Sequence, residues 1–129
     1  MQEKIQKQRE FFRGGKPITL SFRKEALKRL GRTIRAHEEE IYEALRKDLN
    51  KSKTEAYMCE IGMTLAELSY MLKHIDGWAR KRNMLSPIAQ FSSDSFTIRE
   101  PYGVVLIMSP WNYPFLLPLT AWFPASHRW

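Results

Sequence analysis

The residues best placed to do chemistry lie in a polar loop that follows a run of apolar residues. Val104 to Met108 are all apolar, and the sequence SPWNYP follows at 109–114. Because the run is short and does not alternate, it predicts a strand over 103–108 that is covered on both faces, as in a parallel sheet between helices. Ligands of open α/β sheets bind at the carboxyl edge of the strands. The loop is therefore a candidate site.

Two prolines bound this loop. Ser109-Pro110 is expected to end the strand, and Pro114 suits the first turn of a following helix because its φ is already helical and it has no N–H to lose. Trp111, Asn112 and Tyr113 are left at the end of the strand.

Cys59 and His37 are two further residues that could do chemistry. A catalytic thiol needs a helix N-terminus or a cationic neighbour, and Cys59 lies about two turns inside its predicted helix. His37 has no second His or Cys at the spacing of metal ligands. We interpret both as structural residues and predict no metal site.

Helical periodicity covers most of the first two thirds of the chain. A short helix is predicted over 1–13, ended by Gly14-Gly15, and a long one over 21–49. A second long helix, over 53–82, follows a capping box from Ser52 to Glu55. The short connection favours antiparallel packing of the two long helices, while a coiled-coil partner is the alternative. Residues 95–100 alternate in polarity and predict a half-buried strand.

Charge and composition exclude some classes of protein. The net charge of +7 comes from residues 1–53, which hold 15 Lys and Arg against 8 Asp and Glu. These cations alternate with glutamates and no nucleic-acid motif accompanies them, so we expect a solvated helix surface and no nucleic-acid partner. No apolar run reaches the ~18 residues of a membrane span. With a single cysteine and no signal peptide, we expect a cytoplasmic protein with no membrane contact.

The loop and the segments before it resemble the aldehyde dehydrogenase family. Glu100-Pro-x-Gly-Val-Val, followed by Trp-Asn-Tyr-Pro114, is most similar to its class 3 branch. The resemblance extends back through Lys51 to Met58, Glu60-Ile-Gly62 and Ser95 to Pro101, and covers about residues 1–117. It implies an α/β fold, here a partial Rossmann-like cofactor domain made mainly of two long antiparallel helices, a short amino-terminal helix and two strands.

The resemblance also implies an activity, the oxidation of an aldehyde to a carboxylic acid with NAD or NADP. Asn112 matches the asparagine whose amide holds the substrate oxygen, which makes it the oxyanion donor. Met108, Ser109, Pro110 and Trp111 match the segment that lies against the nicotinamide cofactor. The expected partner is a small-molecule aldehyde, and an intact relative can be a homodimer.

The resemblance stops short of a complete catalytic site. The family's Gly-rich turn, general-base Glu and nucleophilic Cys have no counterpart here, so the chain resembles an amino-terminal fragment, and we expect it to be inactive alone. Residues 118–129 are interpreted as an aberrant tail, because Pro124 is expected to prevent a helix. The alternative function is a non-catalytic helical module that binds a partner or a homologous subunit.

Overall fold

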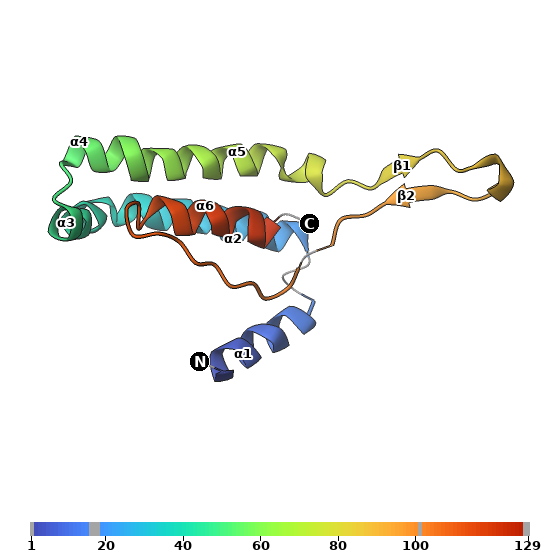
Figure 1. Cartoon of the computed structure of the whole chain (residues 1–129), viewed down its shortest axis with the longest axis horizontal. Helices are drawn as coiled ribbons and strands as arrows, with labels where there is room; N and C mark the ends of the chain where they lie inside the picture. Colours follow the sequence, from blue (N-terminus) through green and yellow to red (C-terminus); the bar gives the residue numbers. More distant parts are fainter. Residues whose placement is uncertain (1, 16–18, 101, 128–129) are drawn as a thin grey trace.

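The computed structural model describes residues 2–15, 19–100 and 102–127, most of which are helical (Figure 1). The helices are α1 (Gln2–Arg13), α2 (Leu20–Ala36), α3 (Glu38–Leu49), α4 (Lys53–Ala56), the π-helical turn η2 (Tyr57–Ile61), α5 (Gly62–Trp78), the 3-10 turn η3 (Ile88–Gln90) and α6 (Leu116–His127). The strands are β1 (Arg82–Met84) and β2 (Ser95–Thr97).

The helix predicted over 21–49 is in fact two helices that meet at His37. The backbone of His37 leaves helical geometry, with φ −110° and ψ 21°, and α3 then turns away from the axis of α2 (Figure 1). Three consecutive glutamates, Glu38 to Glu40, follow the break and form the first turn of α3. Acidic side chains are most stable at the positive end of a helix, which explains why a new helix begins there.

Helical structure next runs from Lys53 to Trp78, through α4, η2 and α5, and ends four residues before the predicted end at 82. The Ser52 hydroxyl accepts a hydrogen bond from the Glu55 N–H at 3.2 Å, which satisfies one free donor of the first turn. α2 and α5 run in opposite directions, as the colours of Figure 1 show, and α6 packs against α5.

The core lies between α2, α3, α5 and α6. Its fully buried side chains include Leu27 of α2, Ile61 of η2, Ile75 of α5 and Phe123 of α6. At Gly31 a methyl group would lie 2.8 Å from Cδ2 of Leu68, so α2 and α5 approach each other too closely for any side chain at this position to fit unless Leu68 moves.

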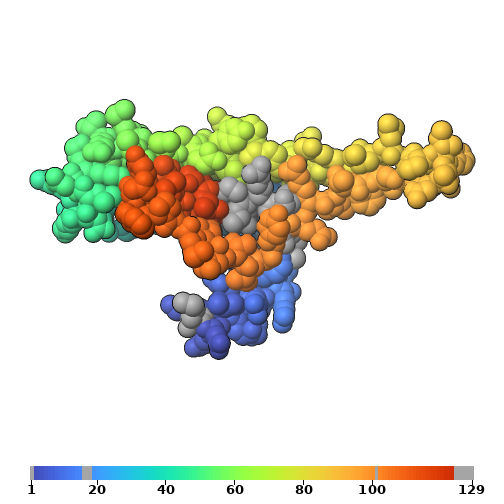
Figure 2. All heavy atoms as spheres, in the orientation of Figure 1, coloured from blue at the N-terminus to red at the C-terminus, as the bar shows by residue number. Residues whose placement is uncertain are grey.

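The two strands form an antiparallel hairpin that projects from the helical body (Figures 1 and 2). Arg82 pairs with Thr97 and Met84 with Ser95, so the strand predicted over 95–100 is observed only over 95–97. β1 (Arg82–Met84) was not predicted, because Arg82 had been assigned to the end of the long helix and Met84 to a loop. The apolar side chains at the far end of the hairpin, Leu85, Ile88 and Phe91, are almost fully exposed.

The described structure has no strand over 103–108, which corrects the sequence prediction. Residues 105–108 have no regular structure, and Leu106 and Met108 are largely exposed rather than covered on both faces. A strand satisfies its backbone groups only by pairing with a neighbour, and no neighbouring strand lies beside this segment in the part of the chain that the structure describes.

The interpretation of 118–129 as a tail without helical structure is also corrected for residues 118–127, whereas 128–129 lie outside the described residues. α6 continues past Pro124 to His127, and Phe123 is fully buried against α2 and α5. A proline inside a helix costs about 3 kcal/mol. Burial of an aromatic side chain is of similar size, so packing onto the body compensates.

Candidate functional site

The segment Met108 to Trp111 lies on the surface, between the hairpin and α6. Its side chains are exposed, and 86% of the Trp111 side chain is accessible to solvent. Within the described residues, its backbone groups make no hydrogen bonds. They are free to be contacted from outside.

Asn112 follows directly and is held through its backbone. Its carbonyl oxygen accepts a hydrogen bond from Nζ of Lys51 at 3.1 Å. Its side-chain amide makes no hydrogen bond to any residue that the structure describes, and the residue is exposed. The backbone of Asn112 is therefore fixed while its amide N–H groups can donate to another molecule.

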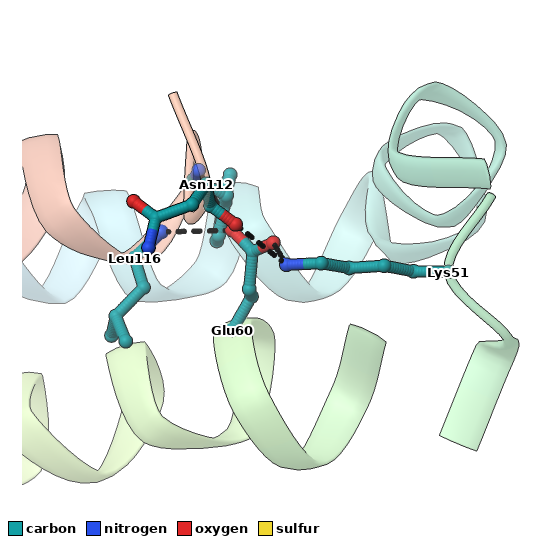
Figure 3. Close-up of polar contacts among 5 residues, drawn as sticks. Lys51, Glu60, Asn112 and Leu116 are labelled. Carbon is teal, nitrogen blue, oxygen red and sulfur yellow. Dashed lines mark hydrogen bonds and ion pairs between the residues drawn. The ribbon is translucent and has the colours of Figure 1, made fainter. Parts of the chain in front are cut away.

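Lys51 belongs to a buried ion pair with Glu60 (Figure 3). Glu60 is completely buried and the Lys51 side chain is only 9% exposed. One carboxylate oxygen of Glu60 accepts from Lys51, while the other accepts from the backbone N–H groups of Phe115 at 2.8 Å and Leu116 at 3.2 Å. The Lys51 ammonium also lies 4.2 Å from the centre of the Tyr113 ring, a cation–π contact. All of these contacts hold residues 112–116.

This network satisfies the start of α6. The first N–H groups of a helix have no partner within the helix, and a negative charge is stable there. Glu60 supplies both the hydrogen-bond acceptor and the negative charge, although it belongs to a different helical segment. Removing one member of a buried ion pair costs about 3–5 kcal/mol, because the other charge is left unpaired.

Local backbone geometry places Lys51 at the site. Asn50 ends α3 in the left-handed conformation, with φ 52° and ψ 29°, and Ser52 caps α4. Lys51 therefore lies in a tight turn between the two helices, and its side chain reaches inward to Glu60 (Figure 3).

Sequence reasoning missed both charged residues of the network. One signal was available. Glu60 lies four residues after Ala56 and four before Thr64, and all three are buried on the inner face of one helix. A carboxylate on a helix face that carries no other charge indicates a partner elsewhere in the fold, although not which one.

Beside the loop lies an apolar hollow of about 490 Å³. It is lined by Leu30, Ile107, Pro114, Phe115, Pro118, Leu119 and Trp122. Phe115 lines this hollow and also donates its backbone N–H to Glu60 of the buried ion pair.

The other candidate residues lie outside this network. Cys59 is half-buried on η2, and Nδ1 of the exposed His37 lies 3.0 Å from Oε1 of Glu40. Among the described residues, no three His, Cys, Asp or Glu side chains gather as a metal site would require. Nor is any described helix long and apolar enough to cross a bilayer.

Comparison with known proteins places this geometry in a family. The model of the aldehyde dehydrogenase family matches residues 1–127. The chain is 41% identical over 117 residues to 4,4'-diaponeurosporen-aldehyde dehydrogenase of Staphylococcus aureus, covering 91% of this chain and 26% of that protein. It is 35% identical over 129 residues to aldehyde dehydrogenase family 3 member B3 of Mus musculus, covering 98% and 27%. It thus spans about a quarter of the length of these relatives.

A solved structure agrees. The substrate-bound state of Staphylococcus aureus AldH superposes with a TM-score of 0.92 at 38% sequence identity, over 98% of this chain and 28% of that chain. The predicted partial aldehyde dehydrogenase fold and the predicted resemblance to the amino-terminal part of the class 3 enzymes are thereby confirmed. The chain belongs to the aldehyde dehydrogenase family.

Proposed function

We propose that this chain supplies the oxyanion donor of an NAD(P)-dependent aldehyde dehydrogenase, and that the donor is the side-chain amide of Asn112. The observation that carries the proposal is that this amide is exposed and makes no hydrogen bond to the described residues, while its backbone is anchored on a buried ion pair. Attack on an aldehyde carbonyl builds negative charge on its oxygen. A neutral N–H donor already in place stabilises that charge by about 3–4 kcal/mol.

Met108, Ser109, Pro110 and Trp111 are proposed to form one wall of the cofactor site. They fit that role because they are exposed and their backbone makes no hydrogen bonds within the described residues. Trp111 adds a flat aromatic surface next to Asn112. The cofactor, NAD or NADP, accepts the hydride of the aldehyde carbon when it is bound.

The nucleophile is proposed to come from outside this chain. Covalent aldehyde oxidation needs a thiolate that can reach the carbonyl carbon. Cys59 is adjacent to Glu60 on one helix, and neighbouring residues of a helix do not face the same way. Since Glu60 points at the 112–116 loop, Cys59 does not. We therefore expect no aldehyde oxidation by the 129-residue chain alone.

Three finer expectations belong to the same proposal. The reaction takes place in the cytoplasm, the substrate is a small-molecule aldehyde, and the intact enzyme is a homodimer. Cell fractionation, a screen of aldehydes of different chain length and sedimentation of the intact enzyme test them separately.

The test is a chimera in which residues 1–127 replace the matching segment of the Staphylococcus aureus relative. We expect this chimera to oxidise aldehydes with NAD or NADP. Asn112→Ala should lower its kcat about 100- to 1000-fold, the loss typical of one oxyanion donor. Asn83→Ala, at an exposed position of β1, is the matched control and should change kcat less than twofold.

The proposal would be contradicted if the chimera with Asn112→Ala had the same kcat as the chimera without this substitution. An inactive chimera in which residues 1–127 are correctly folded would contradict it as well, because the similarity of the two folds predicts that the segments are interchangeable.

A second candidate function is a non-catalytic helical module that binds a homologous subunit. The observation that favours it is the exposure of Leu106 and Met108, which an isolated chain leaves in water. Co-purification with a relative that lacks its matching first quarter, without gain of activity, would support this candidate over the first.

A further inference from the structure

Glu60 lies on an unusual stretch of helix. Residues 57–61 form the π-helical turn η2 within an otherwise α-helical segment. Such turns are rare in proteins as a whole, but where they occur they often lie at functional sites. Because a π turn inserts one additional residue, it changes the direction of the side chains on it relative to an unbroken α-helix.

Gly62 follows the turn directly, and the geometry of the turn leaves no room for a side chain there. A methyl group at Gly62 would lie 2.9 Å from the carbonyl oxygen of Tyr57, a backbone atom that cannot move away without changing the turn. Any residue larger than glycine at position 62 therefore conflicts with the geometry that directs Glu60 inward. Glycine at 62 and the carboxylate at 60 belong to one arrangement.

Lys51 and Glu60 contact residues 112–116 chiefly at backbone atoms of that segment. Lys51 donates to the carbonyl of Asn112, and Glu60 accepts from the N–H groups of Phe115 and Leu116. The two charges thus hold both ends of residues 112–116 (Figure 3). An ion pair that serves stability alone can be replaced by apolar residues at little cost. This pair also supplies backbone partners that apolar residues could not supply.

We infer that Lys51 and Glu60 are positioning residues for the oxyanion donor, and that the π turn directs Glu60 to that task. Holding the backbone at both ends of the loop fixes the direction in which the Asn112 amide leaves the chain. The inference rests on the proposed role of Asn112. A donor that is fixed before the substrate binds costs no reorganisation during the reaction.

The first experiment is NMR spectroscopy of the full 129-residue chain. In Glu60→Gln the amide hydrogens of Phe115 and Leu116 should exchange at least about tenfold faster, and the side-chain amide signal of Asn112 should shift. Glu39→Gln is the matched control, because Glu39 also pairs with a lysine, Lys53, but on the exposed surface. It should change none of these signals.

Gly62→Ala gives an independent test, since it alters the geometry of the π turn while Lys51 and Glu60 both remain in the sequence. It should produce the same changes at Phe115, Leu116 and Asn112 as Glu60→Gln. Lys51→Met should shift the Asn112 signal and accelerate exchange to a smaller extent, because Glu60 keeps its two backbone partners.

Several outcomes would overturn the inference. Unchanged exchange at Phe115 and Leu116 in Glu60→Gln would do so, and so would global unfolding of Glu60→Gln and Lys51→Met alike, which would show a purely structural pair. In the active chimera, Glu60→Gln should lower kcat at least about tenfold with KM changed less than about threefold, and an unchanged kcat would refute the inference. Only Asn112→Ala tests the proposed donor itself. A failure of the positioning role of Lys51 and Glu60 can therefore be told apart from a failure of the donor role of Asn112.

Discussion

Two adjoining segments of this chain, 104–111 and 112–116, differ sharply in how they are held. The first has apolar residues typical of a buried strand, yet Leu106, Met108 and Trp111 lie exposed without regular structure. The second, Asn-Tyr-Pro-Phe-Leu, is also largely apolar, yet it is anchored on a fully buried carboxylate. Hydrophobicity alone therefore does not decide which part of a chain becomes ordered.

The difference has a physical cause. A helix satisfies its backbone groups within itself, so α2, α5 and α6 need only apolar faces to pack together. A strand makes its backbone hydrogen bonds to neighbouring strands, and no such neighbour is available to residues 104–108 within the described structure. The anchored loop depends only on the helices, which this chain contains.

The largest expected effect separates the helical body from the exposed segment. Leu27→Ala, in the centre of the core, should lower the free energy of unfolding by about 2–5 kcal/mol, because it leaves a cavity between α2, α5 and α6. Leu106→Ala is the control of the same chemistry at an exposed position and should change it by less than about 0.5 kcal/mol. Urea unfolding followed by circular dichroism measures both. Equal effects would contradict the contrast between the two regions.

The next effect concerns association. Because Leu106 and Met108 lie exposed, we expect them to drive self-association of the chain. Leu106→Glu should therefore weaken this self-association at least about tenfold, since burial of one leucine is worth about 1.5–3 kcal/mol. Sedimentation velocity over a range of concentrations measures this. Gln8→Glu, which adds the same charge on the exposed face of α1, should have little effect. Equal weakening by both variants would show that net charge, not the segment, controls association.

A smaller effect is expected at the turn that carries Lys51. Ser52→Ala removes the cap of α4 and should lower the free energy of unfolding by about 1 kcal/mol. Ser21→Ala, an exposed serine inside α2, serves as the control. Chemical denaturation resolves the two. If Ser52→Ala were as mild as Ser21→Ala, the capping hydrogen bond would contribute nothing to the turn.

The last effect is confined to alkaline solution. Partial burial raises the pKa of Tyr42 to about 12, and its hydroxyl also donates to the Glu38 carboxylate at 2.6 Å, whose charge acts in the same direction. Because the folded pKa lies above the usual value of 10, the resulting stability is fully present below pH 10 and is lost as the pH rises through 12.

Tyr42→Phe should remove this alkaline loss of stability, while Tyr70→Phe should keep it because Tyr42 is retained. Urea midpoints measured between pH 8 and about 12 provide the test. A steep alkaline loss in Tyr42→Phe would assign the effect to another group.

Much of the helical fold could be predicted from the sequence. The spacing of Leu27, Leu30 and Ile34 defines an inner face, and the capping box at Ser52 marks a helix start that the structure also has. Local signals of this kind depend on residues close together in the chain, so they can be seen without a tertiary structure. The break at His37 had a local signal too, in the three glutamates that follow.

The site divides in the same way. The residue types and order of Trp111, Asn112 and Pro114 identified a candidate loop from the sequence alone. Its anchor could not be found that way, because Lys51 and Glu60 lie more than fifty residues before the atoms they hold. Nothing in the sequence around Lys51 or Glu60 indicates that they contact residues 112–116.

What the sequence determined by itself, then, is the helical character of most of residues 2–78 and the apolar faces of these helices, since these follow from local periodicity, while the resemblance to a known family identified the candidate donor. Only the tertiary structure decided that 103–108 is not a strand, that α6 continues through Pro124, and that Glu60 holds the start of α6. Each of these depends on whether a distant part of the chain supplies a hydrogen-bond partner or a packing surface. That depends on how the whole chain folds.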